Sequence, residues 1–336
     1  MGNKSVADII IDRILKDVEE TGSMPWQRPY ETFTAFNYFT KESYRGINRL
    51  LLPSGEYMTK NQINDYNKKT GEDFTFQKGI KWFPVVFFKH DQEKVSKDEI
   101  FKLLPDDADI TDKINSNDNE YLFSHGSWSY LKVYENEKVG YIKTRSILRY
   151  TPVAERQHFR NSKGEYLPSR IETGEVVITQ SKPNEILQGY FENSGVTVST
   201  TTGIPCYIPG LDAIQLNKHS ISEESYFSTA FHESAHSTGH KSRLNRASLY
   251  GTDKNSYAID ECIAEICACL CCAECGVHSF ETSGTLEYQN NTSYMHFWKG
   301  RIKDWGKEFI YIVSQAEKAF KYIMNTADGN WEEGSI

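Results

Sequence analysis

The sequence predicts an α+β protein built from two domains. Its 336 residues are enough for two hydrophobic cores, and helical stripes alternate with short strand-like runs along the chain. A segment rich in Gly, Ser, Pro and charged residues, from Phe159 to Thr173, has the composition of a linker. We therefore expect an N-terminal α+β domain over 1–158, a linker over 159–173 and a second domain over 174–336.

Two helices are expected in the first domain from the signals at their ends. One runs from Ser5 to Glu20 before Gly22, and the other runs from Thr59 to Lys69 before Gly71. Each begins at a hydroxyl side chain with an acidic or amide side chain three positions later, which is the pattern of a capping box. A glycine after the last turn permits the left-handed conformation that ends many helices.

Strand-like runs follow these helices, from Trp82 to Lys89, from Ser129 to Tyr134 and from Tyr141 to Val153. The stretch from Asp91 to Glu120 is acidic. We expect this stretch to be a partly disordered or loosely helical insertion in the first domain.

In the second domain, the segment from Pro205 to Leu216 predicts two short strands around a turn. Near the end of the chain, an aromatic-rich helix is expected from Thr292 to Trp305 and a last helix from Phe309 to Met324. The strands come directly before the segment that carries the clearest chemical motif.

That motif is Phe231-His232-Glu233-Ser234-Ala235-His236. Residues i and i+4 share one face of a helix, so His232 and His236 can offer nitrogens to the same metal ion. Glu233 stands where a zinc peptidase has its general base. A catalytic zinc ion normally takes three protein ligands and a water molecule. The motif therefore predicts a zinc hydrolase only if a third ligand can be found.

The longer metzincin pattern, HExxHxxGxxH, does not supply this ligand. Gly239 is present, but Ser242 stands where that pattern has its last His. His240 is no substitute, because on a continuous helix it would lie about 12 Å from His232 at a rise of about 1.5 Å per residue. The metzincin arrangement is excluded.

The segment Asp260-Glu261-Cys262-Ile263-Ala264-Glu265 offers a better answer. Its two Glu residues lie four apart on an expected second helix, which is the layout of gluzincins. We assign Glu261 as the third ligand and Glu265 as the residue that hydrogen-bonds a ligand His, with Asp260 an open alternative for the metal contact. The apolar run that follows argues against a merely solvated face. In zinc peptidases, a strand before the metal helix lines the cleft and can pair with an extended peptide.

Composition restricts the setting of such a site. No apolar run approaches the roughly 20 residues that span a bilayer, and the N-terminus lacks a secretory hydrophobic region. We therefore expect a cytoplasmic protein without membrane contact. Six of the seven cysteines lie from Cys262 to Cys275. We interpret them, including the CxxC pair Cys272 and Cys275, as small apolar residues of a buried helix.

Aromatic and basic residues alternate in the first domain. The members are Trp26, Arg28, Tyr30, Phe33, Phe36, Tyr38, Phe39, Lys41, Tyr44, Arg45 and Arg49. Single-stranded nucleic acid binds to such surfaces, with bases stacked on rings and phosphates near cations. Aromatic residues also supply much of a protein core, and composition alone favours that role. The net charge of −8 argues against a protein that binds nucleic acid over its whole surface.

A family resemblance changes this balance. Met24-Pro25-Trp26-Gln27-Arg28-Pro29 and Tyr44-Arg45-Gly46-Ile47-Asn48 resemble the N-terminal domain of the ArdC family. These are antirestriction proteins of conjugative plasmids, related to the N-terminal part of TraC-type primases. His232 to His240, Arg243-Leu244-Asn245-Arg246 and Asp260 to Glu265 resemble the metallopeptidase domain of the same family. The acidic stretch, the cysteine-rich helix and Asp260, where the family often has Glu, are departures.

The resemblance implies a single-stranded-DNA-binding domain, a gluzincin-like zinc metalloendopeptidase domain, and a role in protecting incoming plasmid DNA from restriction. The expected DNA-binding residues are Trp26, Arg28, Tyr44, Arg45, Asn48 and Arg49. His232, His236 and Glu261 are expected to hold Zn²⁺, and Glu233 to act as the base. Tyr257 is a candidate for steadying the oxyanion or else a packing residue, and Asn245 and Arg246 are expected to shape the cleft. The protein or peptide substrate is not indicated.

Two alternatives remain open. The chain could be a DNA-binding protein whose zinc domain is structural or inactive, or a plain metallopeptidase without a role in nucleic-acid binding. Glu233 favours a catalytic site over a structural one, because a structural zinc ion needs no base.

Overall fold

The α+β class is confirmed by a computed structural model, which describes residues 5–27, 35–103, 108–115, 119–135, 138–170, 181–217, 223–277 and 291–330. The contacts between residues divide the chain into two compact units. One unit is Val86–Thr151, and the other joins Met1–Val85 to Pro152–Ile336.

This division does not fall at the expected linker. Phe159 and Leu167, both within 159–173, are fully buried in a cluster with Tyr38 and Met58. The polar composition of the segment concealed these two anchoring side chains. The described part of this segment is therefore packed against the N-terminal region.

The N-terminal region of the larger unit contains two helices with the predicted ends. In α1 (Val6–Thr21) and α3 (Lys60–Thr70), the capping boxes form and the helices end at glycines in the left-handed conformation. The short helix η1 (Pro25–Gln27) and helix α2 (Ile47–Leu51) were not predicted. Helices this short leave little periodicity in the sequence.

Short strands complete this region. Strand β1 (Ala35–Asn37) runs parallel to β2 (Gly55–Met58), and β2 pairs antiparallel with the end of β7 (Lys138–Glu155). Strand β3 (Thr75–Phe76) pairs with β8 (Phe159–Arg160), just after the helix η3 (Arg156–His158).

The smaller unit includes most of the stretch that the sequence predicted to be a partly disordered or loosely helical insertion. Along the sequence this unit does lie between two parts of the larger unit, and its described residues form regular helices and strands. Strand β4 (Phe83–Val95) extends into this stretch and is followed by α4 (Lys97–Leu103), α5 (Ala108–Asn115), β5 (Glu120–His125) and β6 (Trp128–Glu135). The unit has its own core, made by Val95, Ile100, Ile110, Ile114, Leu122 and Tyr130. Acidic residues dominate the composition here, but the isoleucines among them are enough to dock both helices.

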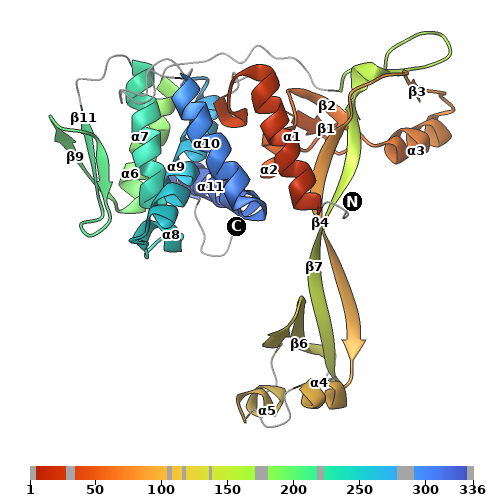
Figure 1. Ribbon diagram of the computed structural model, residues 1–336, viewed down its shortest axis with the longest axis horizontal. Coiled ribbons are helices and arrows are strands. Elements are labelled where there is room, and N and C mark those ends of the chain that lie inside the picture. The colour runs from red at the N-terminus through yellow and green to blue at the C-terminus, as the bar shows by residue number, and fades with distance from the viewer. Residues whose placement is uncertain are drawn as a thin grey trace. The chain divides into compact units, whose positions relative to one another are not determined.

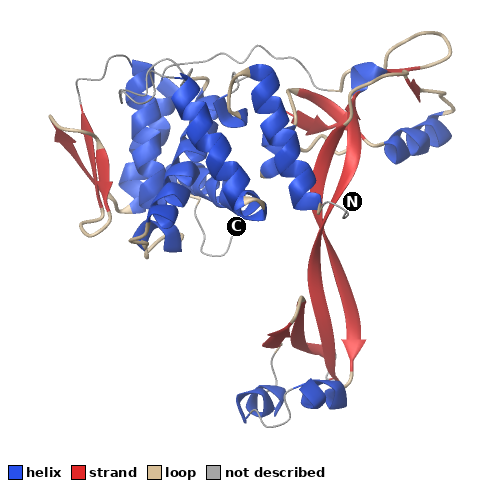
Figure 2. Cartoon of the chain, viewed as in Figure 1, coloured by secondary structure: helices blue, strands red, loops and turns tan. Residues whose placement is uncertain are grey.

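The C-terminal part of the larger unit is mainly helical (Figure 2). Its helices are α6 (Ser181–Ser194), α7 (Glu223–Thr238), α8 (Ala247–Tyr250), α9 (Lys254–Cys275), α10 (Asn291–Trp305) and α11 (Lys307–Ala327). Helix α9 packs against both α7 and α11, as Figure 1 shows. The two helices predicted near the end of the chain are confirmed to within three residues at each end. Among the described residues, no helix has the length and apolar character needed to cross a membrane.

A small sheet lies beside α7. Strand β10 (Cys206–Ile208) pairs antiparallel with β11 (Ala213–Asn217), as predicted, and β11 pairs parallel with β9 (Thr197–Thr201). The order β10-β11-β9 leaves β10 at one edge of this sheet.

Trp26 links the N-terminal region to the C-terminal helices. Its side chain is fully buried, and its ring centroid lies 6.0 Å from that of Trp298 and 6.1 Å from that of Phe309. The guanidinium of Arg49 lies over the ring of Phe320, 5.4 Å from its centroid. The two predicted domains therefore share one hydrophobic core.

This packing makes a prediction about stability. We expect Trp26→Ala to lower the free energy of unfolding by about 3–5 kcal/mol, because it removes a large ring from a closed core. Urea unfolding followed by circular dichroism measures the change. Leu211→Ala is the control, because Leu211 is 72% exposed and its loss should change stability by less than about 0.5 kcal/mol. Equal effects of the two substitutions would contradict the shared core.

Candidate metal centre

Helix α7 presents both histidines on one face, as the motif predicts. Phe227, Ala230, Phe231 and Ala235 are buried and hold the helix against its neighbours. The Nε2 atoms of His232 and His236 lie 3.1 Å apart. Two ligands of a tetrahedral zinc ion, each about 2.1 Å from the metal, lie about 3.4 Å apart. The spacing of the two nitrogens therefore suits a shared metal ion.

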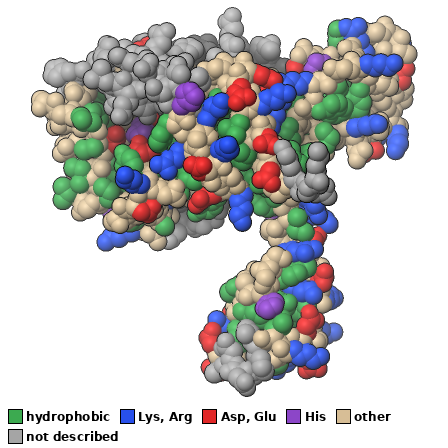
Figure 3. Space-filling model, viewed as in Figure 1, with side chains coloured by type: hydrophobic (Ala, Val, Ile, Leu, Met, Phe, Trp, Pro, Cys, Tyr) green, Lys and Arg blue, Asp and Glu red, His purple; other side chains and the backbone are tan. Residues whose placement is uncertain are grey.

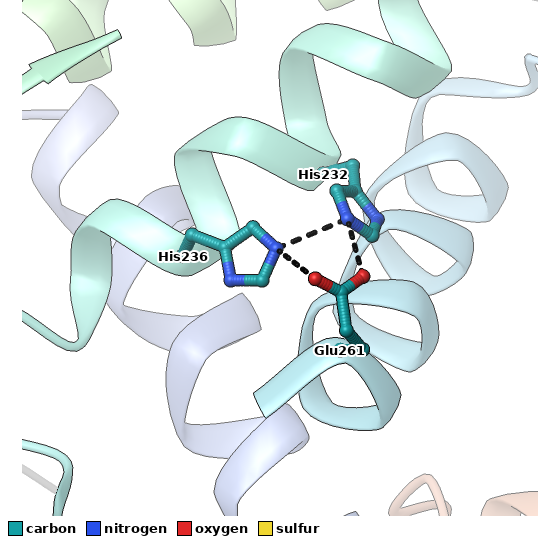
Figure 4. Close-up of side chains that lie close together, drawn as sticks. All are labelled: His232, His236 and Glu261. Atoms are coloured by element: carbon teal, nitrogen blue, oxygen red, sulfur yellow. Dashed lines mark hydrogen bonds and ion pairs between the residues drawn. The ribbon is translucent and has the colours of Figure 1, made fainter. Parts of the chain in front are cut away.

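Helix α9 brings Glu261 to the same point. One carboxylate oxygen lies 3.5 Å from His232 Nε2 and the other lies 3.7 Å from His236 Nε2. Figure 4 shows the two rings and the carboxylate pointing toward one another from the two helices. Their donor atoms all lie within 4.8 Å of one another, and no other group of described residues converges in this way. Two imidazoles and a carboxylate are a donor set typical of catalytic zinc.

Charges within the site already stabilise this arrangement. Burial opposes the charged form of His232, but its hydrogen bond to Glu261 and the charges of Glu233 and Glu265 outweigh burial and raise the pKa of His232 to about 9. Burial likewise opposes ionisation of Glu261, but the two histidines lower its pKa to about 2. Negative charge therefore accumulates around the imidazoles, where a divalent cation would be favoured.

Asp260 orients His236. Its Oδ2 atom lies 2.7 Å from His236 Nδ1, so this nitrogen carries the proton and Nε2 is left free to bind a metal. Burial opposes the charge on Asp260, but hydrogen bonds and charges from His236 and Arg246 hold its pKa well below the usual range. Sequence reasoning considered Asp260 only as an alternative ligand, and it missed this role.

Arg246 fixes Asp260 in turn. Its Nε donates to Asp260 Oδ1 at 2.7 Å, and Ser248 Oγ donates to the same oxygen at 2.9 Å. The other guanidinium nitrogens donate to Thr238 Oγ1 and to the carbonyl of Ala235 on α7. Arg246 is 4% exposed, and it acts by joining the two metal-site helices.

Two other predicted residues lie beside the ligands. The carboxylate of Glu265 is 3.7 Å from His232 Nδ1, which is an ion-pair distance, and its orienting role stays a prediction. Tyr257 is 66% exposed, and its hydroxyl donates a hydrogen bond to Glu261. Tyr257 is therefore placed to contact both solvent and a metal-site carboxylate.

Glu233 is 8% exposed. Its charge acts on His232 and on Cys206 of the edge strand β10, but it forms no hydrogen bond or ion pair with another residue that the structure describes. A buried carboxylate of this kind is suited to accept a proton from a water molecule in the site. The edge strand is thus close to the predicted base.

A second ion pair positions the edge strand. Arg243, whose side chain is 1% exposed, is paired with Asp212 in the turn between β10 and β11. Its Nε donates to the carbonyl of Ser237 at 2.7 Å, and the hydroxyl of Tyr207 donates to Asp212 at 2.8 Å. These bonds connect the β10–β11 turn to the end of α7. His240 hydrogen-bonds Ser242 and lies outside the metal group.

The cysteines of α9 are all buried, as expected for small apolar residues. Burial raises the pKa of Cys272 and Cys275. None of them belongs to a metal-binding group in the described part of the chain.

The predicted DNA-binding residues differ in how far they are exposed to solvent. Trp26 is fully buried, so its ring is not available to stack on a base, and Arg28 lies outside the described residues. Tyr44 is half-buried against Tyr57, and Asn48 is also half-buried. Arg49 covers the ring of Phe320. Only Arg45 of this set is exposed among the described residues.

Two family models match successive parts of the chain. The N-terminal domain of anti-restriction factor ArdC matches residues 4–130, and the zincin-like metallopeptidase family matches residues 185–314. Among curated proteins, two DNA primases TraC from Escherichia coli are 23% and 22% identical over 96% of this chain. The chain spans only 20% and 27% of the length of these primases.

Two solved structures of the antirestriction ArdC protein from plasmid R388 share the fold. The metal-free form has a TM-score of 0.62 and the Mn(II)-bound form 0.61, both at 22% identity. The match covers 98% of this chain and 100% of each of those chains.

The network around Asp260 makes a prediction about metal affinity. We expect Asp260→Asn to weaken zinc binding by about 10- to 100-fold, because the amide cannot hold His236 as a carboxylate does. Competition with a chromophoric chelator measures the affinity. Glu274→Gln, an exposed change on the same helix, is the control and should bind zinc as the wild type does. Unchanged affinity in Asp260→Asn would remove Asp260 from the metal site.

Cysteine burial makes a second prediction. Of the seven thiols, only that of Cys206 is partly exposed, and burial together with the charge of Glu233 raises its pKa. We expect a thiol reagent at neutral pH to label native protein slowly and at one position, which Cys206→Ser abolishes. Mass spectrometry counts the labels, with protein in guanidinium chloride as the control for all seven. Rapid labelling of cysteines in α9 would contradict the observed packing.

Proposed function

We propose that this chain, which belongs to the ArdC family, is an antirestriction protein that binds single-stranded DNA and carries a zinc-dependent metallopeptidase. The convergence of His232, His236 and Glu261 beside the buried Glu233 is the observation that carries the enzymatic part of the proposal. The match of the first part of the chain to the ArdC N-terminal domain supports the remainder.

His232, His236 and Glu261 would hold the metal ion. The spacing of their donor atoms and their chemistry fit Zn²⁺, and the Mn(II)-bound form of the R388 protein supports the binding of a divalent ion. When bound, zinc supplies Lewis-acid chemistry, which polarises a scissile carbonyl and makes a water molecule more acidic.

Side chains of the protein itself would carry out the proton transfers and stabilise the developing charge. Glu233 accepts the proton of the attacking water and delivers it to the leaving amine. Asp260 keeps the proton of His236 on Nδ1, so the ring faces the metal with the correct nitrogen. Tyr257 is an exposed residue whose hydroxyl lies beside Glu261, and it steadies the negative charge that develops on the carbonyl oxygen.

The substrate would be an extended peptide. Strand β10 is an edge strand, and Cys206 on it is close to Glu233. An extended segment of another protein can add to such an edge through backbone hydrogen bonds. The scissile bond would then lie next to the base.

DNA binding belongs to the N-terminal part of the chain. The curated relatives are named DNA primases, and Arg45 offers an exposed cation in the segment that resembles the family. In this role the protein acts in the cytoplasm, where single-stranded plasmid DNA arrives.

The proposal predicts different outcomes for two substitutions in the site. Glu261→Ala should lose bound zinc, because it removes a ligand. Glu233→Gln should keep zinc and lower peptidase activity by about 10²- to 10⁴-fold, because it removes only the base. Elemental analysis and the cleavage of dye-labelled casein measure the two properties.

The control is Glu274→Gln, which should match the wild type in both assays. Zinc retained by Glu261→Ala would contradict the ligand set. Protection of plasmid DNA from restriction in cells should be measured with the same proteins. If Glu233→Gln protects as well as the wild type, proteolysis is not the activity that matters for antirestriction.

A further inference from the structure

A two-stranded part of the smaller unit is exposed on both faces. Strand β4 pairs only with β7 among the described strands. On its other edge, β7 pairs with β6 through Thr144 and with β2 from Ala154 onward. Positions 86–91 of β4 and 145–150 of β7 therefore form a ribbon of two strands, which we call the ribbon.

Side-chain contacts fix the register of the ribbon. Arg145 bonds Asp91, Ser146 bonds His90, and Lys143 pairs with Glu93. The strands are therefore antiparallel, with position 91 opposite 145 and position 90 opposite 146. Side chains alternate between the faces of a strand, which sorts the ribbon residues into two sets.

Each face of the ribbon carries rings. In this register Phe87 lies opposite Arg149, and both are on the same face of the ribbon as Lys89. Phe88 and Tyr150 are on the other face, together with His90. Phe87 is 45% exposed, Phe88 57% and Tyr150 42%. Two-stranded ribbons do not bury aromatic side chains by themselves. Rings exposed on both faces indicate a surface that is used for contact.

The ribbon is also locally basic. Lys89, Arg145 and Arg149 stand against a single acid, Asp91, in a chain whose net charge is −8. Asp91 is shared by Lys89 and Arg145, and Arg149 is exposed opposite Phe87. Figure 3 shows hydrophobic and basic side chains interleaved along this part of the chain. This combination complements a partner that has flat apolar faces and negative charge.

We propose that the ribbon is the stacking platform for single-stranded DNA. Bases stack on Phe88 and Tyr150 on one face and on Phe87 on the other, and phosphates approach Lys89 and Arg149. The inference rests on the proposed DNA-binding function and assigns it to the ribbon instead of the segment 44–49. A second copy of this chain is a less favourable partner for the ribbon than DNA, because two ribbons would bring like-charged cations together without enough acids to compensate them.

The test is the binding of fluorescein-labelled oligo(dT), followed by anisotropy, with the full-length protein. Phe88→Leu and Tyr150→Leu keep an apolar side chain that suits a strand but remove the ring. Each should weaken binding by about tenfold, since stacking accounts for about 1–3 kcal/mol per base. Tyr121→Leu removes a ring that is 51% exposed elsewhere in the same unit and should leave binding unchanged.

Salt dependence tests the cations. The double variant Lys89→Gln with Arg149→Gln should reduce the slope of log affinity against log salt concentration by about 1.4, at about 0.7 per phosphate contact with a single strand. Thermal unfolding confirms that the variants remain folded, which their exposure at the ribbon surface predicts.

The outcomes separate this inference from the proposed function. If every ribbon variant binds DNA as tightly as the wild type, the ribbon is not the platform and DNA binds at another surface. No binding by the wild type at low salt would overturn both. Loss of self-association in the ribbon variants, measured by sedimentation with unchanged DNA binding, would assign the ribbon to a second copy of the chain instead.

Discussion

The ion pair between Asp260 and Arg246 is the interaction on which the candidate metal site depends. Both side chains are almost fully buried, so either charge left alone would be strongly destabilising. Together they are satisfied, because Arg246 also bonds α7 at Ala235 and Thr238 while Asp260 bonds His236. One network therefore joins α7 to α9 and sets the orientation of a predicted ligand.

Apolar packing alone would not give this precision. Helix α9 buries a surface of Cys, Ala and Ile along most of its length, and such small side chains permit a close approach to α7. They also leave the helices free to shift along each other at little cost, since similar side chains recur at every turn. Directional hydrogen bonds remove that freedom, and they lie at the polar end of α9, where the metal site is formed.

The sequence predicted the site residues that are related by short spacings along the chain, and it missed contacts between residues that no local pattern connects. His232 and His236 could be placed because their relation is set by one helical turn, and Glu261 because a second motif lay on an evident helix. The role of Asp260 depends on Arg246, which reaches it from the loop between α7 and α9, and no local pattern encodes that contact. Composition favoured a core role for the aromatic residues, and the family resemblance moved Trp26 to an expected DNA surface, whereas its ring is buried. The order of the acidic stretch was underestimated for a related reason, since its charge obscured the isoleucines that form the core of the smaller unit.

The location of Gly46 shows how the N-terminal region and the metal helices are linked. Its N–H donates to the carboxylate of Glu317, which is 6% exposed on α11, and its φ of +57° is a conformation that favours glycine. Helix α11 packs in turn on α9. If Gly46 moved, the buried carboxylate of Glu317 would lose this donor. Its ion-pair partner in the structure is Lys321, whose Nζ lies 3.8 Å from Glu317 Oε1. The segment 44–49 is therefore constrained by the packing of the C-terminal helices. A surface that must adapt to a flexible strand of DNA needs side chains free of such constraints. The exposed rings of the ribbon meet that requirement.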